Sequence, residues 1–236
     1  MPVRRAPIWG YQDLVLFLSA VLPSLALSAA LLRVSRVVAP ALLASDAART
    51  LVFQSFMYVF LVGALYLVIA WRYHEPFWSA LGWTSPVARD WLSLVGGPGL
   101  TIALSALGVI LRAPSDSSQI ELLIKSRASL AAVMLFGVLL APIFEEMLFR
   151  GFLLPLLMRS LGPWPGILLT AVPFALLHGA QNHWAWQPIM LIGIAGIVFG
   201  YVRYKTRSTT AAFLMHSAYN ATGFLGYALT HWGLLS

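Results

Sequence analysis

The stretch from Ala141 to Phe152, APIFEEMLFRGF, places two adjacent carboxylates, Glu145 and Glu146, and the guanidinium of Arg150 inside a long apolar run. Ionisable side chains at membrane depth are costly, so they indicate a functional site. On a helix, Glu146 and Arg150 lie one turn apart in the favourable order for an ion pair. Glu145 lies about 100° further round, on another face. The spacing predicts that Arg150 neutralises one carboxylate and leaves the other free for chemistry, with a purely structural pair as the alternative.

The composition is typical of a membrane protein. Of the 236 residues, 60% are hydrophobic and 10% are charged, and the mean hydropathy is +0.82, which a soluble domain does not sustain. The net charge of +7 is better explained by loop arginines near anionic lipid headgroups than by nucleic acid. Because the chain has no cysteine, disulfides, thiolate metal sites and a cysteine nucleophile are excluded.

Apolar runs long enough to cross a bilayer follow one another along the chain. They predict an all-α, polytopic transmembrane helical bundle of about seven spans, since roughly 20 apolar residues cross a bilayer. We expect a single membrane domain over residues 1–236, with three spans and a polar loop in 1–128 and a catalytic core in 129–236. The expected spans cover about residues 13–32, 51–71, 91–111, 129–157, 163–184, 188–201 and 209–230.

The fourth apolar run is too long for a perpendicular span. We expect it to be tilted, kinked around Pro142, or broken near Gly151 and Pro155. The residues before it, 113–127, form the most polar stretch of the chain. That composition favours a loop or a short interfacial helix.

The basic residues favour a cytoplasmic N-terminus. Arginine richness and compactness favour a bacterial origin, so we expect a multi-pass protein of a bacterial plasma membrane. With seven spans, the cytoplasmic group would be Arg4, Arg5, Arg72, Arg89, Arg159, Arg203, Lys205 and Arg207. The opposite group would be Arg33, Arg36, Arg49, Arg112, Lys125 and Arg127.

Two more pairs of residues lie one helical turn apart in the C-terminal half, Phe174 with His178 and His216 with Asn220. A bare His or Asn in hydrocarbon is costly. Convergence of these groups with the glutamates would satisfy them all, although a single transmembrane histidine is more often a packing contact. Simple span ends would place His178 and His216 at opposite membrane faces. We therefore expect the fifth span to extend past His178 towards Trp184.

These segments carry a family resemblance. They match three ordered motifs: EExxxR at Glu145-Glu146-Met-Leu-Phe-Arg150, FxxxH at Phe174-Ala-Leu-Leu-His178 and an HxxxN-type motif at His216-Ser-Ala-Tyr-Asn220. Together they resemble the CPBP family of intramembrane proteases, also called the Abi or CAAX-protease-and-bacteriocin-processing family, whose best-known members are type II CAAX prenyl proteases. The resemblance covers about residues 130–224, and the N-terminal spans match only in being hydrophobic.

The resemblance implies an intramembrane endopeptidase. In it, Glu145 and His178 hold and activate a water, with Glu145 as general base. His216 and Asn220 bind the oxyanion of the tetrahedral intermediate. The physics agrees in outline, because a carboxylate in an apolar cavity is a better base near neutral pH, and fixed donors stabilise developing negative charge.

The remaining motif residues would have supporting roles. Glu146 and Arg150 would fix the helix, and Phe174 would pack beside His178. The expected partners are a peptide or membrane-protein substrate and membrane lipid, with no nucleic acid and no cofactor. In a bacterium, peptide processing or regulated intramembrane cleavage is favoured over a prenylated substrate.

Three alternatives stay open. Glu145, His178 and His216 could form a zinc site with a bound water, although the chain has no HExxH helix. A transporter or proton relay would also use intramembrane ionisable groups, but it predicts broken helices in corresponding halves. A non-catalytic membrane scaffold or immunity protein could use the fold without chemistry.

Overall fold

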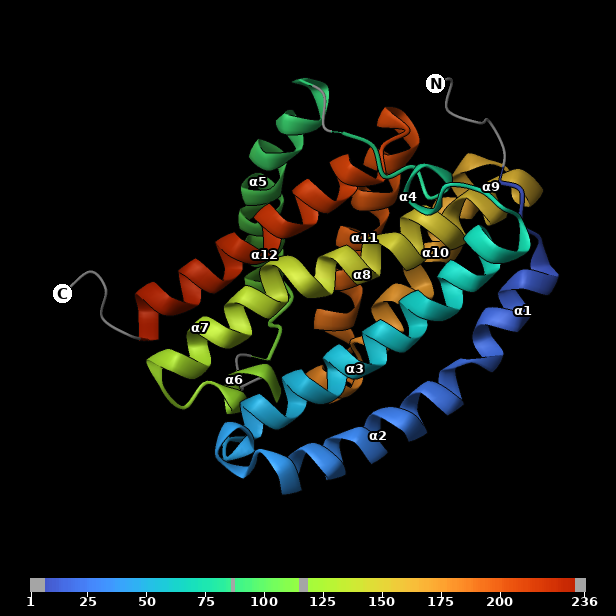
Figure 1. Ribbon diagram of the computed structural model, residues 1–236. Coiled ribbons are helices and arrows are strands. Elements are labelled where there is room, and N and C mark those ends of the chain that lie inside the picture. Colours follow the sequence, from blue (N-terminus) through green and yellow to red (C-terminus); the bar gives the residue numbers. More distant parts are fainter. Residues whose placement is uncertain (1–6, 86–87, 115–118, 232–236) are drawn as a thin grey trace.

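The computed structural model describes residues 7–85, 88–114 and 119–231. All regular elements in these ranges are helical, which confirms the all-α prediction (Figure 1). The elements in chain order are α1 (Tyr11–Ser19), α2 (Val21–Val38), η1 (Pro40–Leu43), α3 (Asp46–Tyr66), η2 (Leu67–Arg72), α4 (Phe77–Ala80), α5 (Ala88–Ile110), α6 (Gln119–Leu123), α7 (Arg127–Leu135), η3 (Phe136–Leu140), α8 (Ala141–Glu146), η4 (Met147–Leu153), α9 (Leu154–Leu161), α10 (Pro163–Leu177), η5 (Ala180–Asn182), α11 (Trp186–Thr206) and α12 (Thr209–His231).

Five helices of the described chain are long and apolar enough to cross a membrane. They cover Tyr11–Val38, Asp46–Arg72, Asp90–Ile110, Arg127–Leu161 and Trp186–Thr206. The fifth and seventh expected spans correspond to α10, a shorter apolar helix, and to α12. The helical membrane bundle is therefore confirmed, while the count of seven spans stays a prediction.

The helix that carries the two glutamates is continuous over Arg127–Leu161, 35 residues. It is not broken at Gly151 or Pro155, because η4 and α9 run through both positions. At about 1.5 Å per residue it is on the order of 50 Å long, more than the roughly 30 Å of a hydrocarbon core. Figure 1 shows it running diagonally across α10 and α11. Its α8 turn lies between the π-helical segments η3 and η4, a form frequent at functional sites.

Helix α10 ends earlier than the sequence predicts. Its last residue is Leu177, and His178 is the C-cap residue. The chain then turns through η5 and through left-handed residues His183 (φ 51°) and Trp184 (φ 58°) before α11 begins. The expected extension towards Trp184 is therefore wrong. At about 1.5 Å per residue these 15 residues span roughly 22 Å, less than the roughly 30 Å of a hydrocarbon core. Phe174 in the last turn of α10 contacts His216 of α12, with ring centroids 5.8 Å apart.

Helices α5 and α12 cross at very short range. A Cβ at Gly97 would lie 2.6 Å from Cβ of Ala218 and 2.7 Å from the carbonyl oxygen of Met215. The hydroxyl of Thr101, one turn further along α5, donates to the carbonyl of Tyr219 at 2.9 Å. Glycine at this crossing lets the backbones approach, as in other membrane helix pairs, and it sets the position of the α12 residues next to the cavity.

The N-terminal segment is anchored to η4. The indole of Trp9 donates to the carbonyl oxygen of Phe152 at 3.0 Å, and the two rings stack with their centroids 5.4 Å apart.

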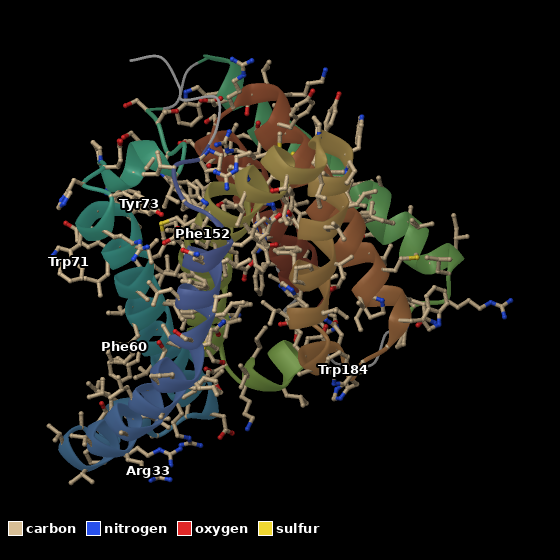
Figure 2. The ribbon with its side chains drawn as sticks, turned by 90° about the vertical axis from the view of Figure 1, so that its right-hand side faces the viewer. Arg33, Phe60, Trp71, Tyr73, Phe152 and Trp184 are labelled. Atoms are coloured by element: carbon tan, nitrogen blue, oxygen red, sulfur yellow. The ribbon has the colours of Figure 1, made fainter. Side chains whose placement is uncertain are left out.

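Figure 2 shows Phe152 inside the bundle, whereas Trp71 and Trp184 lie at its periphery. Residues Trp71 and Trp184 are 71% and 64% exposed, as expected of residues that face lipid or its interface.

Candidate active site

One cavity of about 420 Å³ lies between α3, α6, the long α7–α9 helix, α10, α11 and α12. The four residues expected to act on substrate all line it: Glu145, His178, His216 and Asn220. Phe174 lines it as well. The structure thus brings three motifs into one space, although they come from separate helices.

Glu146 and Arg150 lie behind the cavity wall with no exposed surface. Nη1 of Arg150 donates to Oε1 of Glu146 at 2.8 Å, so the ion pair predicted from their spacing is present. Nη2 of Arg150 donates to the carbonyl of Gly196 on α11 at 2.9 Å. Its guanidinium carbon lies 4.4 Å from the ring centre of Phe174 and 5.3 Å from that of Phe199. The pair therefore connects α8 and η4 to α10 and α11 through hydrogen bonds and cation–π contacts.

His216 contacts both glutamates. Its Nδ1 lies 2.9 Å from Oε1 of Glu146, and its Nε2 lies 3.8 Å from Oε2 of Glu145. The ring stacks on Phe199 with centroids 4.6 Å apart, and only 3% of the residue is exposed. The spacing analysis did not predict the contact with Glu146, because the two residues are 70 positions apart.

The contact with Glu146 determines which nitrogen of His216 carries a proton. An ionised carboxylate only accepts, so Nδ1 of His216 donates to it. A neutral ring then presents a lone pair at Nε2 and has no proton to offer a substrate oxygen there. His216 can donate through Nε2 only as an imidazolium, and in that state it and Arg150 would balance the charges of Glu145 and Glu146.

His178 is oriented by its own helix. Its Nδ1 lies 2.7 Å from the carbonyl oxygen of Phe174, which only accepts, so Nδ1 carries the proton and Nε2 is an acceptor in the neutral ring. The side chain of Asn182 donates to the carbonyl of His178 at 2.9 Å and holds the turn that follows α10. Gln181 of the same turn lines the cavity. His178 and His216 line the same cavity although α10 ends at Leu177.

Asn220 lies one turn beyond His216 on α12. Its Nδ2 donates to the carbonyl of Gly137 in η3 at 2.7 Å. A Cβ at Gly137 would lie 2.7 Å from the ring of Phe224, so a glycine is needed for this approach. One N–H of the Asn220 amide is therefore used to hold the α12–η3 contact, and a second N–H remains available to the cavity.

Helix α3 contributes residues that the sequence analysis did not predict. Thr50, Leu51 and Gln54 line the cavity, and Tyr58 stacks on Phe144 with ring centroids 4.1 Å apart. Thr50, Gln54 and Tyr58 are spaced four residues apart, which puts them on one face of a largely apolar helix. That stripe of polar side chains was the signal that could have identified α3 as part of the site.

The proposed zinc ligands also line this cavity. Within the described part of the chain, no group of three or more His, Asp or Glu side chains is arranged to hold a metal ion.

The fold and the cavity define an integral membrane protein whose helices enclose a cluster of glutamates and histidines. Residues 127–222 match the family model described as Rce1-like, type II CAAX prenyl endopeptidase Rce1-like. The matched segment contains all three motifs, and the family resemblance seen in the sequence is confirmed. No curated protein and no solved structure matches the chain.

Proposed function

We propose that this protein is an intramembrane endopeptidase that hydrolyses a peptide bond with a water activated by Glu145 and His178, without a metal. The observation that carries the proposal is the division between the two adjacent glutamates. Glu146 accepts hydrogen bonds from Arg150 at 2.8 Å and from His216 at 2.9 Å. Glu145 lines the cavity, and its nearest oxygen lies 3.8 Å from the His216 ring nitrogen Nε2. One carboxylate is thus structural and the other is available as a base.

The activated water would lie between two acceptors. Glu145 offers carboxylate oxygens and His178 offers Nε2, so both protons of a water could be engaged while a lone pair of its oxygen points at the substrate. As the water oxygen bonds to the scissile carbonyl carbon, Glu145 takes its proton and the carbonyl oxygen becomes an oxyanion. The proton then passes to the leaving nitrogen as the C–N bond breaks, which yields a carboxylic acid and an amine.

The oxyanion would be bound by donors on α12. Asn220 offers its second amide N–H, and His216 offers Nε2–H as an imidazolium held by Glu146. Donors fixed before the reaction stabilise developing charge without reorganisation. In comparable sites one such donor lowers the activation barrier by about 3 kcal/mol. The substrate in this proposal is a peptide or a segment of a membrane protein.

The test is cleavage of a quenched fluorescent peptide library by the purified protein. We expect Glu145→Gln and His178→Ala to reduce turnover by about 100-fold or more, the range expected for loss of a general base, with thermal unfolding close to wild type. Glu121→Gln, the same change on α6 at a residue outside the cavity lining, is the matched control and should cleave normally.

A zinc chelator distinguishes the proposed metal-independent protease from a metalloprotease. Cleavage that resists the chelator and is lost in both cavity variants supports the proposal. Cleavage that the chelator abolishes and zinc restores would replace it with a metalloprotease. If the folded wild type cleaves nothing, or Glu145→Gln cleaves normally, the proposed mechanism is wrong.

A further inference from the structure

The cavity wall contributed by α3 contains a side-chain amide that the proposed chemistry does not use. Gln54 lines the cavity together with Thr50 and Leu51. Most of the surrounding wall is apolar, with Leu123, Phe136 and Phe224 among its members. A primary amide in such a wall is costly unless its donors and acceptor find partners.

The hydrogen bonds of Gln54 leave it half satisfied. Its Nε2 donates to the hydroxyl of Tyr58 at 2.8 Å. A glutamine amide has two N–H groups and one carbonyl oxygen. Within the described residues this is its one hydrogen bond, so one N–H and the Oε1 acceptor remain. A donor beside an acceptor is the complement of a peptide group, which presents one C=O and one N–H.

The position of Gln54 relative to Glu145 follows from the aromatic contact. Tyr58 stacks on Phe144, the residue before Glu145. Tyr58 therefore lies at about the same height along α3 as the proposed base. Gln54 lies one helical turn, about 5.4 Å, nearer the N-terminus of α3. An extended peptide advances about 3.3 Å per residue. A chain lying along α3 would therefore present to Gln54 the main chain roughly two residues away from the bond that meets Glu145.

We propose that Gln54 binds the main chain of an extended peptide substrate and so aligns the scissile bond with Glu145. The peptide passes Thr50 and Leu123 on its way to the base, and its apolar side chains pack against Leu51 and Phe224. This inference rests on the proposed function, because the bound segment is the one that Glu145 would cleave.

The experiment compares Gln54→Leu, which removes the amide, with Tyr58→Phe, which removes only the partner of that amide. Gln54→Met, of similar length, is a second variant in case the leucine is not accommodated. Each change is made in wild type for kinetics and in Glu145→Gln for binding without turnover. The binding probe is a dansyl-labelled pool of nonapeptides with apolar residues at every second position, together with the same pool N-methylated at one position at a time.

We expect Gln54→Leu to raise KM and the dissociation constant of the pool by about 5- to 30-fold, the effect of removing one or two hydrogen bonds, with a smaller change in kcat. Tyr58→Phe should have a clearly smaller effect on both constants. N-methylation at one position should weaken binding to the Glu145→Gln protein and should cost nothing further once Gln54 is replaced by leucine.

Two results would overturn the inference. Equal effects of Tyr58→Phe and Gln54→Leu would mean that Gln54 only supports Tyr58, and an unchanged KM in both Gln54 variants would mean that the amide does not meet the substrate. The proposed function fails separately: if wild type cleaves no peptide but the pool binds in a Gln54-dependent way, the subsite stands and the protease mechanism does not.

Discussion

The imidazole of His216 is held by Glu146, with 2.9 Å between Nδ1 and Oε1, and Oε1 of Glu146 also accepts from Arg150 at 2.8 Å. One buried carboxylate oxygen thus joins α8, η4 and α12. Because Glu146 and Arg150 have no exposed surface, neither charge can be left alone without a large desolvation cost.

Replacing Arg150 with Met should destabilise the protein by about 3–5 kcal/mol, since it leaves the negative charge of the Glu146 carboxylate buried without the guanidinium that balances it. The double variant Glu146→Gln, Arg150→Met removes both charges and should recover part of that loss. It should nevertheless stay inactive, because a neutral amide in place of the Glu146 carboxylate would not hold His216 as an imidazolium. Thermal unfolding in detergent and peptide turnover measure the two effects, and a single Arg150→Met variant of wild-type stability would contradict the account.

Replacing Asn220 with Ala should lower kcat by about 100- to 1,000-fold with little change in KM, the effect of losing one oxyanion donor. Thr222→Val is the control on the same helix, because the Thr222 hydroxyl donates only to Ala218 one turn back. If Asn220→Ala lowers the unfolding temperature and leaves kcat intact, its role is confined to the hydrogen bond with Gly137.

Replacing Gly97 with Ala should cost about 1–3 kcal/mol of stability, the usual penalty of overpacking, because the new Cβ would lie 2.6 Å from Cβ of Ala218. Gly99→Ala, two residues further along α5, has no atom within 4 Å of the new Cβ and should be neutral or stabilising. Unfolding temperatures of the two variants make the comparison. Similar destabilisation by both variants would mean that the close approach of α5 and α12 at Gly97 does not decide the outcome, since alanine favours the helix over glycine at both positions.

Two carboxylates near the helix ends should differ sharply in importance. Asp46, whose side chain is 51% exposed, pairs with Lys125 at 2.8 Å. Asp13, whose side chain is 3% exposed, accepts from Tyr73 at 2.6 Å and contacts Arg72 at 3.1 Å. Asp46→Asn should leave the unfolding temperature nearly unchanged, since exposed ion pairs contribute little.

Asp13→Asn should lower the unfolding temperature clearly, because it removes the charge of a buried carboxylate that accepts hydrogen bonds from Tyr73 and from the backbone of Gly10 and contacts Arg72. The ranking of the two variants in one unfolding assay is the check. A larger effect of Asp46→Asn would show that the link between α3 and the segment before α7 matters more than the contacts of Asp13.

The sequence by itself determined the features that depend on contacts within a helical turn or on composition. Apolar runs of sufficient length indicated a helical membrane protein, and the spacing of Glu146 and Arg150 predicted an ion pair that the structure contains. The three motifs also predicted the family that residues 127–222 match. These inferences succeed because helix geometry fixes which residues lie one turn apart, whatever the rest of the chain does.

Only the tertiary structure decided how the helices meet. The contact of His216 with Glu146 joins residues 70 positions apart, and the cavity lining contributed by Gln54 comes from a helix that the motifs do not include. The sequence analysis extended α10 to bring His178 to His216, whereas the structure ends that helix at Leu177. Such contacts depend on where each helix ends and how closely helix pairs such as α5 and α12 pack, and both are set by side chains distant in sequence.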